Sequence, residues 1–221
     1  MPGISRSSVR AAILDALALV SPVECAGCGA PDRSLCDVCR LALVAAPDAR
    51  ELPGIDRGVP VLAALRYEGI VRKVILEFKQ NDRTGLARAL AVPFGRLVRS
   101  VLGDASVVVV PVPPGRASSR RRGYDPVALL VKRAGIRRTH ALRLVRSGSG
   151  QKLLGIDARQ SNRAGSMRAS NLVRGRRVIL VDDVITTGAT VVEAARAITA
   201  SGGSIVAIVA LASTPRRTDF V

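Results

Sequence analysis

One segment, residues 177–190, constrains the fold of this chain more than any other part of the sequence. It opens with an aliphatic run at 178–181, which is typical of a strand buried on both faces of a parallel sheet. Two adjacent carboxylates, Asp182 and Asp183, follow this run, and a hydroxyl-rich loop leads from them into a helical pattern over 191–200. Strand, loop and helix in succession are the repeating unit of α/β proteins. We therefore expect an α/β fold with a mostly parallel sheet flanked by helices.

The residues that follow this strand also indicate a ligand. The carboxyl ends of parallel strands form the edge at which open α/β sheets bind ligands. Backbone N–H groups over 186–190 begin a helix and lack intrahelical partners, so with the helix dipole they favour a phosphate group. Asp182 and Asp183 are acceptors suited to a pair of sugar hydroxyls. The combination predicts a site for a phosphorylated ribose. The alternative is an ordinary strand-turn-helix with an acidic turn.

Residues 177–190 resemble the signature with which type I phosphoribosyltransferases bind 5-phosphoribosyl-1-pyrophosphate (PRPP). The resemblance implies that Asp182 and Asp183 accept hydrogen bonds from the ribose 2- and 3-hydroxyls. It also implies that Mg²⁺ comes with PRPP and bridges its oxygens, with few direct protein ligands. The 5-phosphate would be held by Thr186, Thr187, Gly188, Ala189 and Thr190.

The four cysteines of the chain form two Cys-x-x-Cys pairs near the N-terminus. Four thiolates in this arrangement predict a closed tetrahedral zinc site, which is structural because no coordination position stays open. Two disulfides are the alternative, but nothing else in the sequence suggests export, and cytosolic thiols stay reduced. We therefore expect a cytoplasmic protein with structural Zn²⁺ on Cys25, Cys28, Cys36 and Cys39.

The length and composition fit one α/β domain with a small appendage. A chain of 221 residues with 48% hydrophobic content is large enough to bury a core. We expect an N-terminal helix and zinc knuckle over 1–45 and the α/β domain over 46–221. Because the sequence has no apolar run of about 18 residues, we expect no membrane span.

The net charge of +17 suggests polyanionic partners, but the basic residues qualify this inference. They are 30 arginines and only four lysines, which together with abundant alanine and valine indicates a coding bias toward arginine. The chain also has only five aromatic residues, few for the stacking platforms of single-stranded nucleic acid. A weak contact with single-stranded DNA therefore stays open as an alternative.

Hydrophobic periodicity gives the remaining elements. Proline at position 93 predicts a kink, or two helices, within the helical pattern over 85–102. The segment 147–165 is too long for a simple connection. We expect further helices over 1–22, 70–79 and 126–133, and strands over 61–66, 107–112, 141–145 and 205–211.

Nearly the whole chain resembles the competence protein F family of phosphoribosyltransferase-like proteins, a group that includes ComFC and GntX-like members. The PRPP motif is specific to the superfamily, and its combination with the N-terminal knuckle narrows the resemblance to this family. The other matching segments are Ser21-Pro22, Tyr67-Glu68-Gly69, Phe78-Lys79, residues 110–113 and 120–124, and Gln151, Leu154, Arg159 and Asn162.

This family resemblance implies roles outside the PRPP motif. The turn over 112–116 would grip pyrophosphate, or it is simply a proline-rich strand end. Arginines 116 and 120–122 would neutralise the pyrophosphate or form a solvated basic loop. The segment 147–165 would be a lid that carries Arg159. The candidate catalytic residues are therefore Asp182, Asp183, Arg116 and Arg159.

Two functions follow from the resemblance. The first is an enzyme that transfers phosphoribosyl from PRPP to an unidentified acceptor in a Mg²⁺-dependent reaction, linked to DNA uptake. The second is a catalytically quiet PRPP sensor or DNA-processing adaptor that contacts a protein of the competence machinery; an oligomer is compatible with either. In 6-oxopurine enzymes an aspartate opens the phosphate loop, whereas Thr186 stands here, so hypoxanthine and guanine lose support as acceptors.

Overall fold

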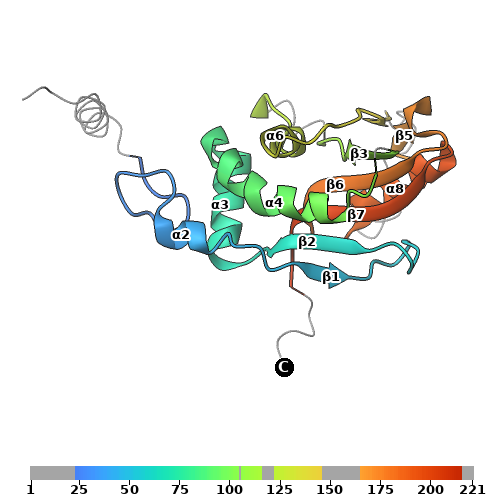
Figure 1. Ribbon diagram of the computed structural model, residues 1–221. Coiled ribbons are helices and arrows are strands. Elements are labelled where there is room, and N and C mark those ends of the chain that lie inside the picture. The colour runs from blue at the N-terminus through green and yellow to red at the C-terminus, as the bar shows by residue number, and fades with distance from the viewer. Residues whose placement is uncertain (1–22, 105, 116–121, 146–164, 216–221) are drawn as a thin grey trace, which may run out of the picture.

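A computed structural model describes residues 23–104, 106–115, 122–145 and 165–215. The centre of the fold is a five-stranded sheet (Figure 1). The strand order is β1-β2-β7-β6-β3. Four neighbouring strands run parallel, and β1 pairs antiparallel with β2 at one edge. The expected mostly parallel sheet is therefore confirmed. The strands are β1 (Asp48–Arg50), β2 (Val61–Arg66), β3 (Val107–Pro111), β6 (Arg177–Ile185) and β7 (Ser204–Ser213).

The central strands are buried on both faces, which explains their continuous aliphatic sequences. In β6, Ile179 and Val181 pack into the core on one face, whereas Val178 and Leu180 pack into the core on the other. This alternation is the two-residue period of a strand. It places the two following residues, Asp182 and Asp183, at the carboxyl end of a strand in the middle of the sheet.

Three helices cover one face of the sheet: α3 (Gly69–Gln80), α4 (Ala87–Val101) and α6 (Pro126–Arg133). Of the two alternatives expected at Pro93, a division into two helices is not observed, since α4 runs through it as one helix. The proline ring is buried in the core, and the helix loses one backbone hydrogen bond there. Helix α6 begins as expected, because Asp125 caps it by accepting a hydrogen bond of 3.0 Å from the Ala128 N–H.

Helix α8 (Ala189–Ala200) and a small hairpin cover the other face. The hairpin consists of β4 (Leu142–Leu144) and β5 (Met167–Ala169), which pair antiparallel in a sheet of their own. The strand expected over 141–145 therefore does not join the main sheet. The buried carboxylate of Glu193 fixes the hairpin to α8 by accepting a 2.9 Å hydrogen bond from the Met167 N–H, and Arg196 pairs with the same carboxylate.

The cysteine pairs and helix α2 (Asp37–Leu41) lie at the end of the molecule beside α3 and α4 (Figure 1). Cys25, Leu35 and Cys39 belong to the same hydrophobic core as these two helices. Arg83, which follows α3, donates hydrogen bonds to the carbonyls of Glu24 and Ser34. The helix expected over 1–22 lies outside the described residues. Within the described part of the chain, no helix has the length and apolar character needed to cross a membrane.

Candidate active site and metal centre

The two carboxylates of the predicted site lie at the carboxyl end of β6. Asp182 and Asp183 are both partly buried, and Oδ1 of Asp182 accepts a hydrogen bond of 2.8 Å from the Asp183 N–H. Successive side chains of a strand point to opposite faces, so Asp182 lies on the α8 side of the sheet and Asp183 on the α3 side. Together they present acceptors across the edge of the sheet.

Lys79, the penultimate residue of α3, forms an ion pair with Asp183. Its Nζ lies 2.8 Å from Asp183 Oδ2, and the two side chains are only 20% and 14% exposed. The sequence drew attention to Phe78-Lys79 only through a family resemblance, with no role attached. Nothing in a single sequence indicates that residue 79 meets residue 183, because the contact depends on how α3 packs on the sheet.

The carboxylates at this edge influence one another's ionisation. Burial, together with the neighbouring charge of Asp183, raises the pKa of Asp182 to about 8, while the Asp183 N–H and Lys79 oppose the rise. Burial and the charge of Asp183 also raise the pKa of Asp125, the N-cap of α6. The site therefore accumulates negative charge that a cation or a hydroxyl donor would relieve.

The loop after β6 brings the predicted phosphate-binding residues together. Thr186 and Thr187 are exposed, and Ala189 and Thr190 are partly buried. Gly188 has a φ of 79° and is the N-cap of α8. A left-handed conformation of this kind favours glycine. The loop ends on the first N–H groups of a twelve-residue helix, which is an arrangement that attracts anions.

The phosphate-binding loop is supported by residues 50–52, which the sequence did not identify as part of the site. Arg50 of β1 donates hydrogen bonds of 3.4 Å to the Ile185 carbonyl and 3.1 Å to the Thr214 carbonyl. Leu52 packs against Gly188. Sequence reasoning missed this support, because β1 has three residues, too few to show the two-residue period of a strand.

The expected pyrophosphate turn begins at the carboxyl end of β3, the strand next to β6. The Val112 N–H continues the pairing with a 2.9 Å hydrogen bond to the Val181 carbonyl, so this turn starts beside Asp182. Nearby, the Tyr124 hydroxyl donates a hydrogen bond to the Phe78 carbonyl. Two candidate catalytic residues, Arg116 and Arg159, lie outside the described residues, as do arginines 120 and 121 and the expected lid residues 151, 154 and 162.

A cavity of about 1070 Å³ opens beside the phosphate loop. The β1–β2 connection lines it on one side and the outer face of α8 on the other, and it reaches Thr187 and Ala189. Asp182 and Asp183 are not among its lining residues. The cavity therefore borders the phosphate end of the predicted site and does not reach its carboxylate end.

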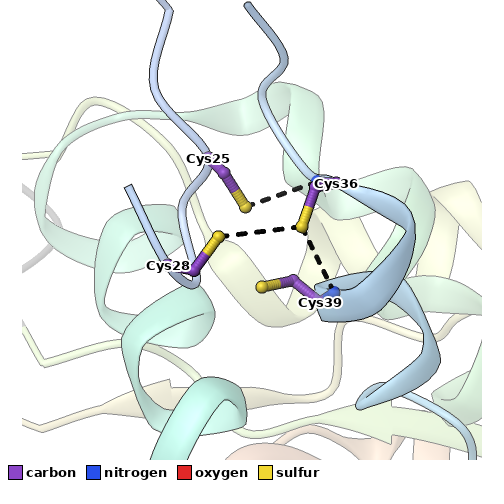
Figure 2. Close-up of side chains that lie close together, drawn as sticks. All are labelled: Cys25, Cys28, Cys36 and Cys39. Atoms are coloured by element: carbon purple, nitrogen blue, oxygen red, sulfur yellow. Dashed lines mark hydrogen bonds between the residues drawn. The ribbon is translucent and has the colours of Figure 1, made fainter. Parts of the chain in front are cut away.

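The four cysteines converge, as Figure 2 shows, and none forms a disulfide. Their sulfur atoms all lie within 4.8 Å of one another, and the Sγ atoms of Cys28 and Cys36 are 3.7 Å apart. A tetrahedral zinc ion with Zn–S bonds of about 2.3 Å holds its sulfurs about 3.8 Å from each other. The arrangement therefore fits Zn²⁺, and the disulfide alternative is not observed.

Backbone groups around the cysteines favour thiolates at part of this cluster. Burial alone would raise the pKa of Cys25, but hydrogen bonds from the N–H groups of Cys36, Cys28 and Gly27 lower it to about 6. Burial and the neighbouring cysteines raise the pKa of Cys39. Gly27 is required by close packing, since a Cβ there would lie 2.5 Å from Cys39 Sγ.

Comparisons with known proteins agree with these features. The phosphoribosyl transferase domain family matches residues 86–221, more than half of the chain. The DNA utilization protein YhgH of Escherichia coli K12 is 26% identical over 198 residues, which cover 86% of this chain and 84% of that protein. The competence protein ComFC of Bacillus subtilis 168 is 25% identical over 136 residues, 62% of this chain and 56% of that protein.

Two solved structures are also similar in part. Orotate phosphoribosyltransferase from Aeropyrum pernix has a TM-score of 0.35 and 15% identity, over 80% of this chain and 91% of that one. The structure of the allosteric regulatory enzyme of purine biosynthesis has a TM-score of 0.36 and 20% identity. It covers 57% of this chain, which corresponds to a quarter of the other chain.

Proposed function

Because this chain belongs to the phosphoribosyl transferase domain family, and within it to the competence protein F group, we propose that it binds PRPP and transfers its phosphoribosyl group. One observation carries the proposal. Asp182 and Asp183 end β6, and the loop that begins at Thr186 leads from them into the N-terminus of α8, with Gly188 in the conformation that the turn requires. Acceptors for a diol and donors for a phosphate thus lie on one continuous turn.

Under this proposal the residues have separate tasks. The carboxylates of Asp182 and Asp183 accept hydrogen bonds from the 2- and 3-hydroxyls and fix the sugar. The N–H groups over 186–190, with the hydroxyls of Thr187 and Thr190, hold the 5-phosphate. Transfer expels pyrophosphate from the anomeric carbon through an oxocarbenium-like state, so cations near the leaving group lower the barrier. From the sequence, Arg116 and Arg159 remain the candidates for this role.

Magnesium fits this site. The negative charge of Asp182, Asp183 and Asp125 at this edge of the sheet suits a divalent cation that is brought in by PRPP. When bound with PRPP, magnesium would supply positive charge at the pyrophosphate oxygens. The protein's own contribution is to orient the sugar and the phosphate around it.

The acceptor is left open, and the exposed Thr186 at the start of the loop supplies no carboxylate for a purine base. The names of the relatives, DNA utilization protein and competence protein, lead us to propose a link to DNA handling. The same names suit a catalytically quiet PRPP sensor or adaptor that meets DNA or a protein of the competence machinery. Both functions need PRPP binding, and only the enzyme needs turnover.

We further propose that Zn²⁺ on the four cysteines stabilises the N-terminal part, with the boundary between the two parts near residue 45. The 3.7 Å sulfur separation supports a metal, and the burial of Cys25 and Cys39 in the core beside α3 supports a structural role. The proposed place of the protein is the cytoplasm, where unbridged thiols persist.

Pyrophosphate release tests the enzyme against the sensor. The purified protein is incubated with PRPP, Mg²⁺ and a panel of bases and amines, and pyrophosphate is measured. Release that needs both Mg²⁺ and an acceptor, and that Asp182→Asn abolishes, supports the enzyme. PRPP binding without release for any acceptor favours the sensor.

A further inference from the structure

We propose that Lys79 is a positioning residue, whose ammonium group fixes the carboxylate of Asp183 in the orientation needed to accept a hydrogen bond from the ribose. The inference rests on the proposed function, because it assigns a role at the same site. It adds a residue from α3, which precedes the region that the family match covers.

The contact is close and sheltered. Lys79 Nζ lies 2.8 Å from Asp183 Oδ2, and both side chains are more than three-quarters buried. A lysine so placed has one short charge-assisted hydrogen bond to hold the carboxylate, and little water competes for either partner. The pair therefore restricts the rotamer of Asp183 more than an exposed surface pair would.

The end of α3 that carries Lys79 is itself held in place. The preceding residue, Phe78, is fully buried, and its ring centroid lies 5.8 Å from that of Tyr124. The Tyr124 hydroxyl donates a hydrogen bond to the Phe78 carbonyl. The backbone that positions Lys79 is thus attached to the segment before α6, so the ammonium group has a defined place over the sheet edge.

The ammonium group of Lys79 offsets the negative charge of the carboxylates around it. Three carboxylates influence one another here, those of Asp182, Asp183 and Asp125. Among the described residues, Lys79 is the cation in ion-pair contact with this group. Of the groups on neighbouring elements, Arg138 acts on Asp125, and Asp82 and Arg122 act on the hydroxyl of Tyr124, which Asp183 also influences.

Removal of the ammonium group has a defined chemical consequence. Without it, the Asp183 carboxylate loses the partner that fixes its orientation, and Asp182 loses a nearby positive charge that lowers its pKa. A protonated carboxyl has lost acceptor capacity toward a diol, so the ribose is bound less well. The loss is greatest at low pH and is relieved when higher pH removes the proton. A lysine that only packed α3 on the sheet would give no such pH dependence.

The experiment compares Lys79→Met, Lys79→Arg and the control Lys73→Met, an exposed lysine on the same helix. Calorimetry measures the affinity for PRPP with Mg²⁺ between pH 6.5 and pH 9. We expect Lys79→Met to weaken binding about tenfold at pH 7, the largest effect that a rise of about one unit in the pKa of Asp182 gives, and to recover most of the loss at pH 9. Lys79→Arg should stay close to the unaltered protein, and Lys73→Met should equal it. Unchanged binding by Lys79→Met, or a loss that is the same at every pH, would overturn the inference.

A second measurement needs no ligand. Carbon-13 NMR titration of the aspartate carboxyls should show a higher midpoint for Asp182 in Lys79→Met than in the unaltered protein, because Lys79 lowers the pKa of Asp182. If the unaltered protein bound no PRPP at all, the proposed function would fail. If it bound PRPP while the Lys79→Met midpoint stayed unchanged, the inference about Lys79 alone would fail.

Discussion

Leu52 packs so closely against Gly188 that a Cβ on residue 188 would lie 2.8 Å from Leu52 Cδ2. The contact joins the connection after β1 to the N-cap of α8. It means that the phosphate loop is shaped by its own glycine and also by a side chain far away in the sequence. The two requirements on residue 188, a φ of 79° and no side chain, reinforce each other.

Gly188→Ala should therefore lower both stability and PRPP affinity. We expect a loss of about 2 kcal/mol or more in the free energy of unfolding, from the left-handed backbone and the contact with Leu52. Denaturant unfolding and calorimetry with PRPP are the measurements.

Gly135→Ala is the matched control, since Gly135 has a φ of 69° and a Cβ there would have no neighbour within 4 Å. It should lose about 1 kcal/mol of stability from the backbone alone and keep its PRPP affinity. Leu52→Ala should restore part of the loss in Gly188→Ala. Equal PRPP affinities of the two glycine variants would contradict the role of the contact.

Arg50→Met should weaken PRPP binding through the backbone of the phosphate loop. The substitution removes both hydrogen bonds to the carbonyls of Ile185 and Thr214, which costs about 1–3 kcal/mol of stability. We expect a loss of PRPP affinity of about threefold to tenfold by calorimetry, in line with a cost of about 1 kcal/mol. Arg57→Met, at an exposed position in the connection that follows β1, is the control and should bind PRPP normally. An Arg50→Met protein that binds as well as this control would show that the loop needs no support from β1.

The local parts of the site could be predicted from the sequence, and the long-range parts could not. Residues 177–190 carry strand, carboxylates, loop and helix in one continuous stretch, so local patterns were enough. The two cysteine pairs likewise lie within one short stretch of sequence, residues 25–39. Lys79 and Arg50 reach the site only through the packing of α3 and the pairing of β1, and a single sequence contains no signal for either contact.

Two details of the fold depend on tertiary contacts that local sequence patterns do not specify. The strand over 141–145 pairs with β5 instead of joining the main sheet, because Glu193 and Ser201 bind the hairpin to α8. At Pro93, where two helices were an alternative, α4 continues as one helix, since the proline is buried within a helix that tertiary packing supports. Tertiary contacts outweigh local propensity in both places.

The zinc site predicts one metal ion for each chain and a stability that depends on it. Cys39→Ser should abolish zinc retention and lower the free energy of unfolding by about 4 kcal/mol or more, because Cys39 is fully buried beside α3. Elemental analysis and thermal unfolding measure the two effects. Gly27→Ala should also weaken zinc retention through the contact with Cys39 Sγ, whereas Gly85→Ala, with open space around it, should not. Native protein free of zinc would refute the metal site.

The burial and hydrogen bonds of Glu193 predict that it stabilises the folded state in a pH-dependent way. Burial alone would raise its pKa, but hydrogen bonds from Arg196 and the Met167 N–H outweigh burial and hold the pKa below its usual range. A lowered pKa in the folded state gives a stabilisation that is complete above the unfolded value of about 4.3 and is lost as the pH falls through the folded value. Glu193→Gln should therefore cost about 3 kcal/mol at pH 7 and much less below about pH 4.

Urea unfolding at several pH values measures this difference. Glu68→Gln removes an exposed partner of Arg66 and should cost less than about 1 kcal/mol at any pH. A penalty for Glu193→Gln that stayed the same from pH 7 to pH 3 would contradict the role of the charge.

Titration calorimetry with PRPP and Mg²⁺, on the unaltered protein and on Asp182→Asn, tests the central claim most directly. The account predicts that the unaltered chain binds PRPP at one site and that Asp182→Asn, with its fold intact by circular dichroism, binds at least about tenfold more weakly, a loss of about 1.4 kcal/mol. An unaltered chain that gives no binding signal, or an Asp182→Asn protein with unchanged affinity, would contradict it.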